Sequence, residues 1–263
     1  MQTRIEVKMN NHSNLKQELQ NLELKEKRFL NKKVVDGKLK EKVYKKIPEN
    51  LEETLNNVFI KAFEITFNNG TSIIEKSFDK EKINLEYEVN KFVLDYKENS
   101  KNIKNLDNQP KKSNLLNNVF TTSVGTGMGI LGLGIPDIPL FVATILRGIY
   151  QVALSYGFDY KTKKEKIYIL RLICTALSKT PEEKYKHNEV LENGKYYNII
   201  LEDEIKYTAQ VMANALLLEK FIQGIPVVGA VGGVVNNSIY RKISNFSMIK
   251  YKKRYIKDKL KNK

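Results

Sequence analysis

The sequence predicts an all-α, multi-helix bundle with glycine-rich apolar helical hairpins and a long basic C-terminal helix. Apolar residues recur at spacings of three and four over most of the chain, whereas the alternation typical of strands is almost absent. The 263 residues are 41% hydrophobic, which is enough for a sizeable core. A single cysteine, Cys174, excludes an internal disulfide, and Cys174, His12 and His187 are too few for a four-ligand zinc site.

The net charge of +15 is concentrated at the two ends of the chain. Residues 1–46 carry 13 Lys+Arg and 6 Asp+Glu, and residues 241–263 carry 10 Lys+Arg with Asp258 as the one acidic residue. Basic ends favour anionic partners, either lipid headgroups or nucleic acid. Because residues 1–33 are rich in lysine and asparagine, we expect a solvated, partly helical tail there. We therefore divide the chain into a basic polar extension, 1–44, and a helical domain, 45–263.

In the first half of the domain, helix signals are clear up to a polar stretch. A helix is predicted from Pro48, a favoured first-turn residue, to Gly70, and a short helix follows Thr71. The next helix carries an apolar set at helical spacing: Leu85, Val89, Phe92, Val93 and Tyr96. Residues 98–112 are predicted to be a linker or long loop.

Two uncharged, glycine-containing segments follow. Residues 113–136 are 24 residues without a charge and residues 221–240 are 20, each interrupted by Gly-Ile-Pro. Their small-residue spacing lets helices approach closely, and both approach the length of a membrane span. We interpret them as buried core hairpins or as shallow interfacial hairpins. The mean hydropathy of −0.43 argues against a membrane-spanning pair.

Downstream of the first segment, helix and turn signals alternate. A helix is predicted to begin at Asp137 and to end just before Gly157. The later pattern predicts a helix at Lys163–Ser178, followed by loop signals at Pro181, Asn188 and Gly194 within residues 179–200. A short strand is expected at Tyr196–Leu201, a helix at Asp203–Ile222 and a final helix at about Val227–Leu260.

The helix at 137–157 carries a polar stripe on an otherwise apolar surface. Steps of three, four and seven place Asp137, Arg147 and Gln151 along one face. An arginine in this setting needs an acceptor, because an unpaired buried charge is costly. We expect Arg147 to bind carbonyls, Asp137 or a tyrosine, with Asn236 or Asn237 of the final helix nearby. Tyr240 lies four residues after Asn236 on the same face of that helix. Such a cluster either fixes helix register or binds a lipid headgroup or other small anion.

Two motif blocks of the sequence resemble a known family. The first is Gly134-Ile-Pro-Asp-Ile-Pro-Leu140, followed by Arg147 and Tyr156-Gly-Phe-Asp159, and the second is the glycine-rich run from Pro226 to Asn236. Over residues 45–258 the chain is similar to the EcsC family of bacterial proteins. The resemblance implies a helical intracellular protein, encoded in some bacteria beside an ABC-type exporter. It adds Tyr156 and Asp159 to the residues of interest and implies no molecular activity.

The functional expectation is a non-enzymatic, cytoplasmic protein associated peripherally with the inner face of the membrane. It would bind anionic lipid or a membrane partner, including ABC-type transporter components, without a cofactor or metal. The anionic surface contact is expected on the final helix, at Lys250, Lys252, Lys253, Arg254 and Lys257. One alternative is a hydrolase that uses Asp137 or Asp159. Another is nucleic-acid binding through the basic termini, which few arginines and no recognition module make less favoured.

Overall fold

The computed structural model describes residues 2–32, 49–116, 137–194, 196, 198–222 and 234–261. Every regular element in these ranges is a helix, which confirms the all-α prediction. The elements are α1 (Gln2–Asn31), α3 (Glu49–Ile65), the π-helical turn η1 (Thr66–Gly70), α4 (Thr71–Lys76), α5 (Lys80–Tyr96), α6 (Ser100–Asn105), α7 (Asn108–Leu116), α9 (Asp137–Ser155), α10 (Lys163–Leu177), α11 (Pro181–Asn193), α12 (Leu201–Ile222) and α13 (Val234–Lys261).

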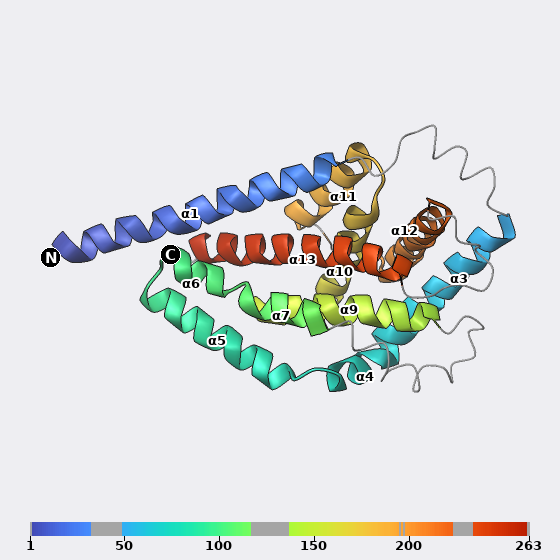
Figure 1. Cartoon of the computed structure of the whole chain (residues 1–263), viewed down its shortest axis with the longest axis horizontal. Helices are drawn as coiled ribbons and strands as arrows, with labels where there is room; N and C mark the ends of the chain where they lie inside the picture. The colour runs from blue at the N-terminus through green and yellow to red at the C-terminus, as the bar shows by residue number, and fades with distance from the viewer. Residues whose placement is uncertain are drawn as a thin grey trace.

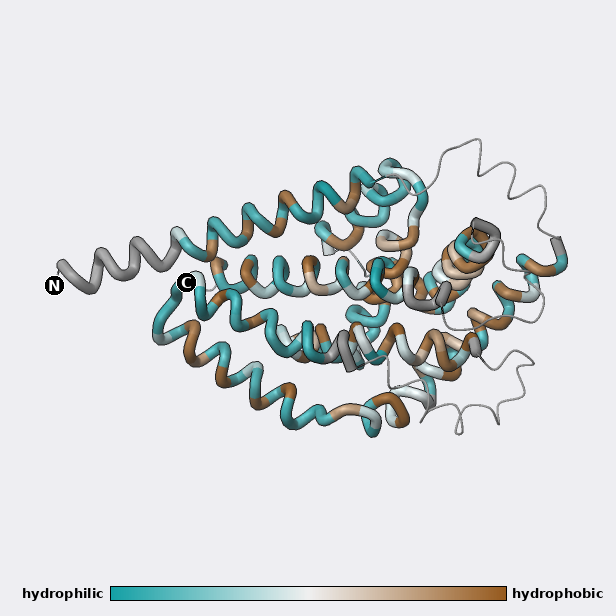
Figure 2. Tube along the Cα trace, viewed as in Figure 1, coloured by the Kyte–Doolittle hydropathy of each residue, from teal (hydrophilic) through white to brown (hydrophobic). Residues whose placement is uncertain are grey.

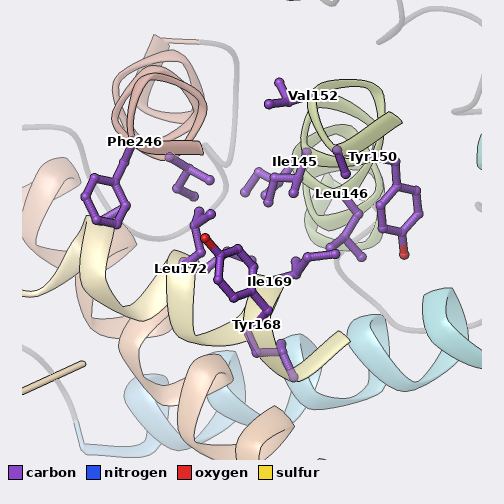
Figure 3. Close-up of a cluster of buried hydrophobic side chains, with 14 of the residues drawn as sticks. Ile145, Leu146, Tyr150, Val152, Tyr168, Ile169, Leu172 and Phe246 are labelled. Carbon is purple, nitrogen blue, oxygen red and sulfur yellow. The ribbon is translucent and has the colours of Figure 1, made fainter. Parts of the chain in front are cut away.

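Helices α9 and α10 form the centre of the bundle. Among the described residues, Ile138–Ser155 of α9 is long and apolar enough to cross a membrane, but 94% of this stretch is buried inside the fold. Helices α3, α5, α7 and α13 pack around α9. Figure 3 shows side chains of α9 and α10 meeting, with Phe246 of α13 at the edge of the same cluster. Helix α9 is therefore a core helix, and its apolar length follows from burial on all sides.

Helix α1 runs antiparallel to α13 along one side of the molecule (Figure 1). Leu15, Leu22 and Leu30 are buried, and Phe29 stacks on Phe246 with ring centroids 4.6 Å apart. The second half of α1 therefore contributes to the core. The expectation of a solvated tail at residues 1–33 is wrong for this part, because leucines spaced by seven and eight residues form one apolar face.

Several helix ends follow their sequence signals. Thr180 forms a capping box with Glu183 at the start of α11, and Gly194 ends that helix with a left-handed φ of 62°. Gly157 ends α9 with a φ of 77°. The Phe158 N–H donates to the carbonyl of Ala153 at 2.9 Å, as in a Schellman motif. The predicted bounds of α9 are thereby confirmed.

Three sequence predictions of local structure are wrong. Residues 179–200, expected to be mainly loop, contain α11, which begins after the Thr180 cap and ends at Gly194. Residues 98–112, expected to be a loop, contain α6 and most of α7, because Ile103 and Leu106 are buried and Asn99 caps α6. No strand occurs in the described part of residues 196–201, and α12 begins at Leu201. Most of the glycine-rich segments, at 117–136 and 223–233, lies outside the described residues, so the hairpin predictions remain predictions.

The two left-handed glycines provide a matched test of backbone geometry. A Cβ at Gly157 would overlap the ring of Tyr87, whereas a Cβ at Gly194 would meet nothing within 4 Å. We expect Gly194→Ala to lower the free energy of unfolding by about 1 kcal/mol, from the backbone alone. Gly157→Ala should cost more, because the Tyr87 ring must also move. Urea unfolding of both variants measures the difference, and equal losses would show that Tyr87 does not constrain this turn.

Candidate functional site

Arg147 crosses from α9 to the C-terminal end of α4. Its Nε donates to Ser77 Oγ and its Nη2 to the Ser77 carbonyl, both at 3.0 Å. The side chain is 7% exposed, and burial lowers the pKa of Arg147. Because carbonyls at a helix C-terminus carry partial negative charge, this end of α4 is a suitable acceptor for a buried guanidinium. The acceptor thus comes from α4, an element that the polar-stripe hypothesis did not consider.

Gln151 and Ser155 continue the same face of α9 one and two turns after Arg147. Gln151 and Ser155 are buried, and Ser155 Oγ donates to the Gln151 carbonyl at 2.7 Å. Tyr240 of α13 packs against Gly148, where a Cβ would lie 2.6 Å from the tyrosine Oη. The structure therefore brings Arg147 and Tyr240 to the same part of the α9–α13 contact. The side chains of Asp137 and Asn236, on the first turns of α9 and α13, lie outside the described residues.

The two remaining residues of the predicted cluster lie elsewhere. Tyr156 donates its hydroxyl to Asp107 Oδ1 at 3.1 Å, in the turn between α6 and α7, and its burial raises the pKa of Tyr156. Asp159 is exposed, and its Oδ1 accepts the Lys161 backbone N–H at 3.0 Å. Tyr156 and Asp159 therefore do not join Arg147, and the hydrolase alternative gains no assembled site among the described side chains.

The basic residues of α13 meet carboxylates from several other helices. Lys250, 2% exposed, donates to Glu26 Oε1 at 2.6 Å, to Asn188 Oδ1 at 2.9 Å and to Glu192. Lys253 binds Glu26 and Glu192 as well. Burial alone would lower the pKa of Lys253. The carboxylates of Glu26 and Glu192 stabilise its ammonium by more than that, so the pKa of Lys253 is raised.

The neighbouring α13 cations are also paired. Lys252 lies 2.7 Å from Glu18 Oε1 of α1 and 2.9 Å from Asp107 Oδ1. Arg254 donates to both oxygens of Glu165, at 2.9 and 2.8 Å, and the Tyr251 hydroxyl donates to the same carboxylate at 2.8 Å.

The guanidinium of Arg254 also lies over an aromatic ring. The guanidinium carbon of Arg254, Cζ, is 4.0 Å from the centroid of the Phe158 ring, within the range of a cation–π contact.

Glu192 accepts from three lysines. Lys257 Nζ lies 2.6 Å from Glu192 Oε2, and Lys250 and Lys253 bind the other oxygen. Burial alone would raise the pKa of Glu192, but Lys250 and the other two ammonium groups hold it well below its usual range.

This packing corrects the expectation of an exposed cationic surface on the final helix. Lys250, Lys252 and Lys253 are buried, while Arg254 and Lys257 are half-buried. The physical reason is that a buried ammonium is stable only with acceptors, and α1, α11 and the α6–α7 turn supply them. One sequence signal could have indicated this arrangement. Glu26 lies four residues from both Leu22 and Leu30, on the apolar face of α1.

A second polar cluster joins α10, α11 and α12. His187 Nδ1 lies 3.1 Å from Arg171 Nη1, and His187 Nε2 lies 3.1 Å from the Tyr207 hydroxyl. Because a guanidinium only donates, Nδ1 is the acceptor and the neutral ring carries its proton on Nε2. Burial and the Arg171 charge lower the pKa of His187 to about 4, and Glu204 neutralises Arg171 at 2.7 Å.

Cys174 lies beside this second cluster. Its Sγ is 3.3 Å from Thr208 Oγ1, and burial raises the pKa of the thiol to about 12. Such a thiol is protonated at neutral pH and packs as a small apolar group. Among the described side chains, no group of three or more His, Cys, Asp or Glu is arranged to hold a metal ion.

The fold and the site can now be compared with known proteins. A model of the EcsC protein family matches residues 12–256. The chain belongs to the EcsC protein family. The match begins within α1, and not at residue 45 as the motifs had suggested, in agreement with the packing of α1 on α13.

Two curated relatives of this EcsC-family chain come from Bacillus subtilis (strain 168). The uncharacterized protein YdbA is 30% identical over 150 residues, which cover 54% of this chain and 52% of that protein. Protein EcsC is 27% identical over 136 residues, which cover 51% of this chain and 56% of that protein. The chain thus spans about half the length of these relatives. No solved structure matches it significantly.

Glu26 provides a test of the internal ion pairs in this EcsC-family protein. Glu26→Gln removes one of the two carboxylates that the buried Lys250 and Lys253 share and leaves Glu192 as the other, so the free energy of unfolding should fall by about 1–3 kcal/mol. Glu23→Gln changes an exposed carboxylate on the same helix and should cost less than about 0.5 kcal/mol. Urea unfolding of the two variants compares them. Similar stabilities would mean that α1 is not held by these pairs.

His187 predicts a specific pH dependence of stability. The unfolded imidazole takes up a proton near pH 6.5, whereas the folded one does so only near pH 4. In this window the unfolded state binds more protons, so the free energy of unfolding decreases as pH falls from about 6.5 to about 4. His187→Gln should reduce the loss between about pH 7.5 and pH 5 by on the order of 2 kcal/mol. An unchanged pH dependence of unfolding would show that His187 titrates normally.

Proposed function

We propose that this EcsC-family protein associates peripherally with a membrane surface, with the outer face of α5 placed in the interfacial layer. The observation that carries the proposal is a row of exposed apolar side chains on that helix. This outer face consists of Leu85, Val89, Phe92, Val93 and Tyr96.

The row is continuous along one side of α5. Steps of four, three and four residues join Leu85, Val89, Phe92 and Tyr96, so these side chains share a helix face. Leu85, Phe92 and Tyr96 are 66%, 71% and 85% exposed. Helix α5 lies at the edge of the molecule in Figure 1, and hydrophobic positions recur along it in Figure 2. A contiguous apolar surface of this kind marks a contact site.

The outer face is not needed to attach α5 to the protein. The opposite face carries Ile83 and Leu94, both buried, and the half-buried Tyr87, whose ring meets that of Tyr255 on α13. Helix α5 also packs against α9. A surface helix normally presents one apolar face to the core and a polar face to water. The second apolar face of α5 therefore requires an environment other than water.

A lipid interface fits this face better than a second copy of the chain. The spacing of the row also occurs in coiled coils, but it rises only about 16 Å along the helix, less than two heptads. A stable protein interface buries about 1,000 Å² or more, which so short a seam does not supply. An interfacial helix needs only shallow burial of one face, and aromatic residues such as Phe92 and Tyr96 favour that depth.

The net positive charge of the chain also favours a membrane surface, because electrostatic attraction acts over a longer distance than apolar contact. The net charge of +15 attracts the chain to anionic headgroups. On α5 itself the charges are mixed, with Glu88 and Asp95 on one flank and Lys82 within the row. Apolar burial would therefore hold α5 in the interface, while the overall charge draws the protein to an anionic leaflet. Binding should weaken with salt without being abolished.

The test is co-sedimentation with vesicles that contain anionic lipid. The double variant Leu85→Gln/Phe92→Gln should bind at least about tenfold less tightly, because each large apolar side chain contributes about 1.5–3 kcal/mol when fully buried. The matched control is Leu24→Gln, which removes an exposed leucine from α1 and should bind like the wild type.

Three results would contradict the proposal. Equal binding by the double variant would exclude the outer face of α5 as the contact. A wild-type dimer that the double variant converts to monomers would assign this face to self-association. Binding to native membranes but not to protein-free vesicles would point to a membrane protein, such as an ABC-type transporter component, as the occupant.

A further inference from the structure

A cavity of about 350 Å³ opens between the start of α10, the end of α11 and the C-terminal half of α13. We call it the α13 cavity. Its wall contains six cationic side chains from α10 and α13, namely Lys164, Lys250, Lys253, Arg254, Lys257 and Lys261. Tyr168, Leu191 and Tyr196 form an apolar and aromatic part of the same wall.

The cations of the α13 cavity exceed the carboxylates that reach them. Two acidic residues line the cavity, Glu192 and Asp258, and two more bind its cations from behind, Glu26 and Glu165. Six positive charges therefore face four negative ones. The excess of two lies at the rim, where the exposed Lys164 and Lys261 have no ion-pair partner among the described residues.

One carboxylate already shows which chemistry this wall accepts. The oxygens of Glu192 receive the ammonium groups of Lys250, Lys253 and Lys257. Glu192 lies in the last turn of α11, where the helix dipole disfavours a negative charge, so the lysines provide its stabilisation. The side chain is still partly exposed to the cavity. An oxyanion with more charge than a carboxylate would find the same donors together with two unpaired lysines at the rim.

We propose that the α13 cavity binds a phosphomonoester, with the dianionic phosphate held by Lys164, Lys257 and Lys261. A phosphate of charge near −2 balances the excess of two positive charges in the α13 cavity. Its oxygens can also accept hydrogen bonds from several ammonium groups at once. Tyr168 and Tyr196 lie where the organic part of the ligand would pack. The ligand is either a soluble phosphomonoester or a lipid with a monoester headgroup. This proposal does not depend on the outer face of α5.

The first arm of the test titrates inorganic phosphate into the intact protein by calorimetry at low salt. The double variant Lys164→Ser/Lys261→Ser should bind phosphate roughly tenfold more weakly. Glu192→Gln should bind it several-fold more tightly, since it removes a competing carboxylate, the ion-pair partner of Lys257. The matched control is Lys16→Ser/Lys206→Ser, which removes two exposed lysines of α1 and α12 and should bind like the wild type.

The second arm identifies the source of the phosphate. Vesicles containing phosphatidic acid carry a phosphomonoester, whereas phosphatidylglycerol carries a diester at similar surface charge. Binding of inorganic phosphate that depends on Lys164 and Lys261 supports a soluble ligand. If binding depends on these lysines only with vesicles of phosphatidic acid, and not with inorganic phosphate, the ligand is a lipid.

The proposal is overturned if the double lysine variant matches the wild type in both arms, or if Glu192→Gln fails to tighten binding. If neither inorganic phosphate nor vesicle binding depends on Lys164 and Lys261, while vesicle binding still needs Leu85 and Phe92, the phosphate site is excluded and the proposed membrane association remains.

Discussion

The fold depends on ion pairs between the C-terminal half of α13 and carboxylates from helices distant in sequence. Lys250 and Lys253 bind Glu26 of α1, and Arg254 binds Glu165 of α10. Transferring such charges from water is costly, so each is tolerated only while its partner is in place. Buried networks of this kind are stable as complete units and unstable in part. The two ends of the chain are therefore stabilised together, and α1 belongs to the same structure as the helices that follow it.

This internal use of cations changes where the protein can meet other molecules. The lysines of α13 with the lowest exposure are occupied by carboxylates, so they are not an open basic surface. Among the described residues we propose two contact surfaces: the apolar outer face of α5 and the cationic rim of the α13 cavity. They differ in chemistry, because one excludes water and the other attracts negative charge. Separate variants can therefore affect one feature and leave the other unchanged.

The sequence predicts the helices far better than the contacts between them. Helical spacing and the glycine after the last turn are sufficient to predict α9. For α11 the sequence misleads, because Pro181, Asn188 and Gly194 favour a loop although Pro181 begins the helix and Gly194 caps its end. The short helices α6 and α7 were missed because their few apolar residues, such as Ile103, give little periodicity. For α5 the apolar residues were recognised, but the helix has two apolar faces and periodicity alone does not show which one meets the core. Arg147 binds Ser77, 70 residues away, and Lys250 binds Glu26, 224 residues away, and local patterns do not reach such distances.

The basic segment of α13 is internal, and the chemical reactivity of its individual lysines provides a direct test of that burial. An amine-reactive reagent applied to the native protein, followed by mass spectrometry, gives a labelling rate for each lysine. We expect Lys250, Lys252 and Lys253 to react far more slowly than the exposed Lys206 and to become equally reactive on unfolding. If the three lysines are labelled in the native protein as fast as Lys206, they lie on an open surface and are not held in internal ion pairs.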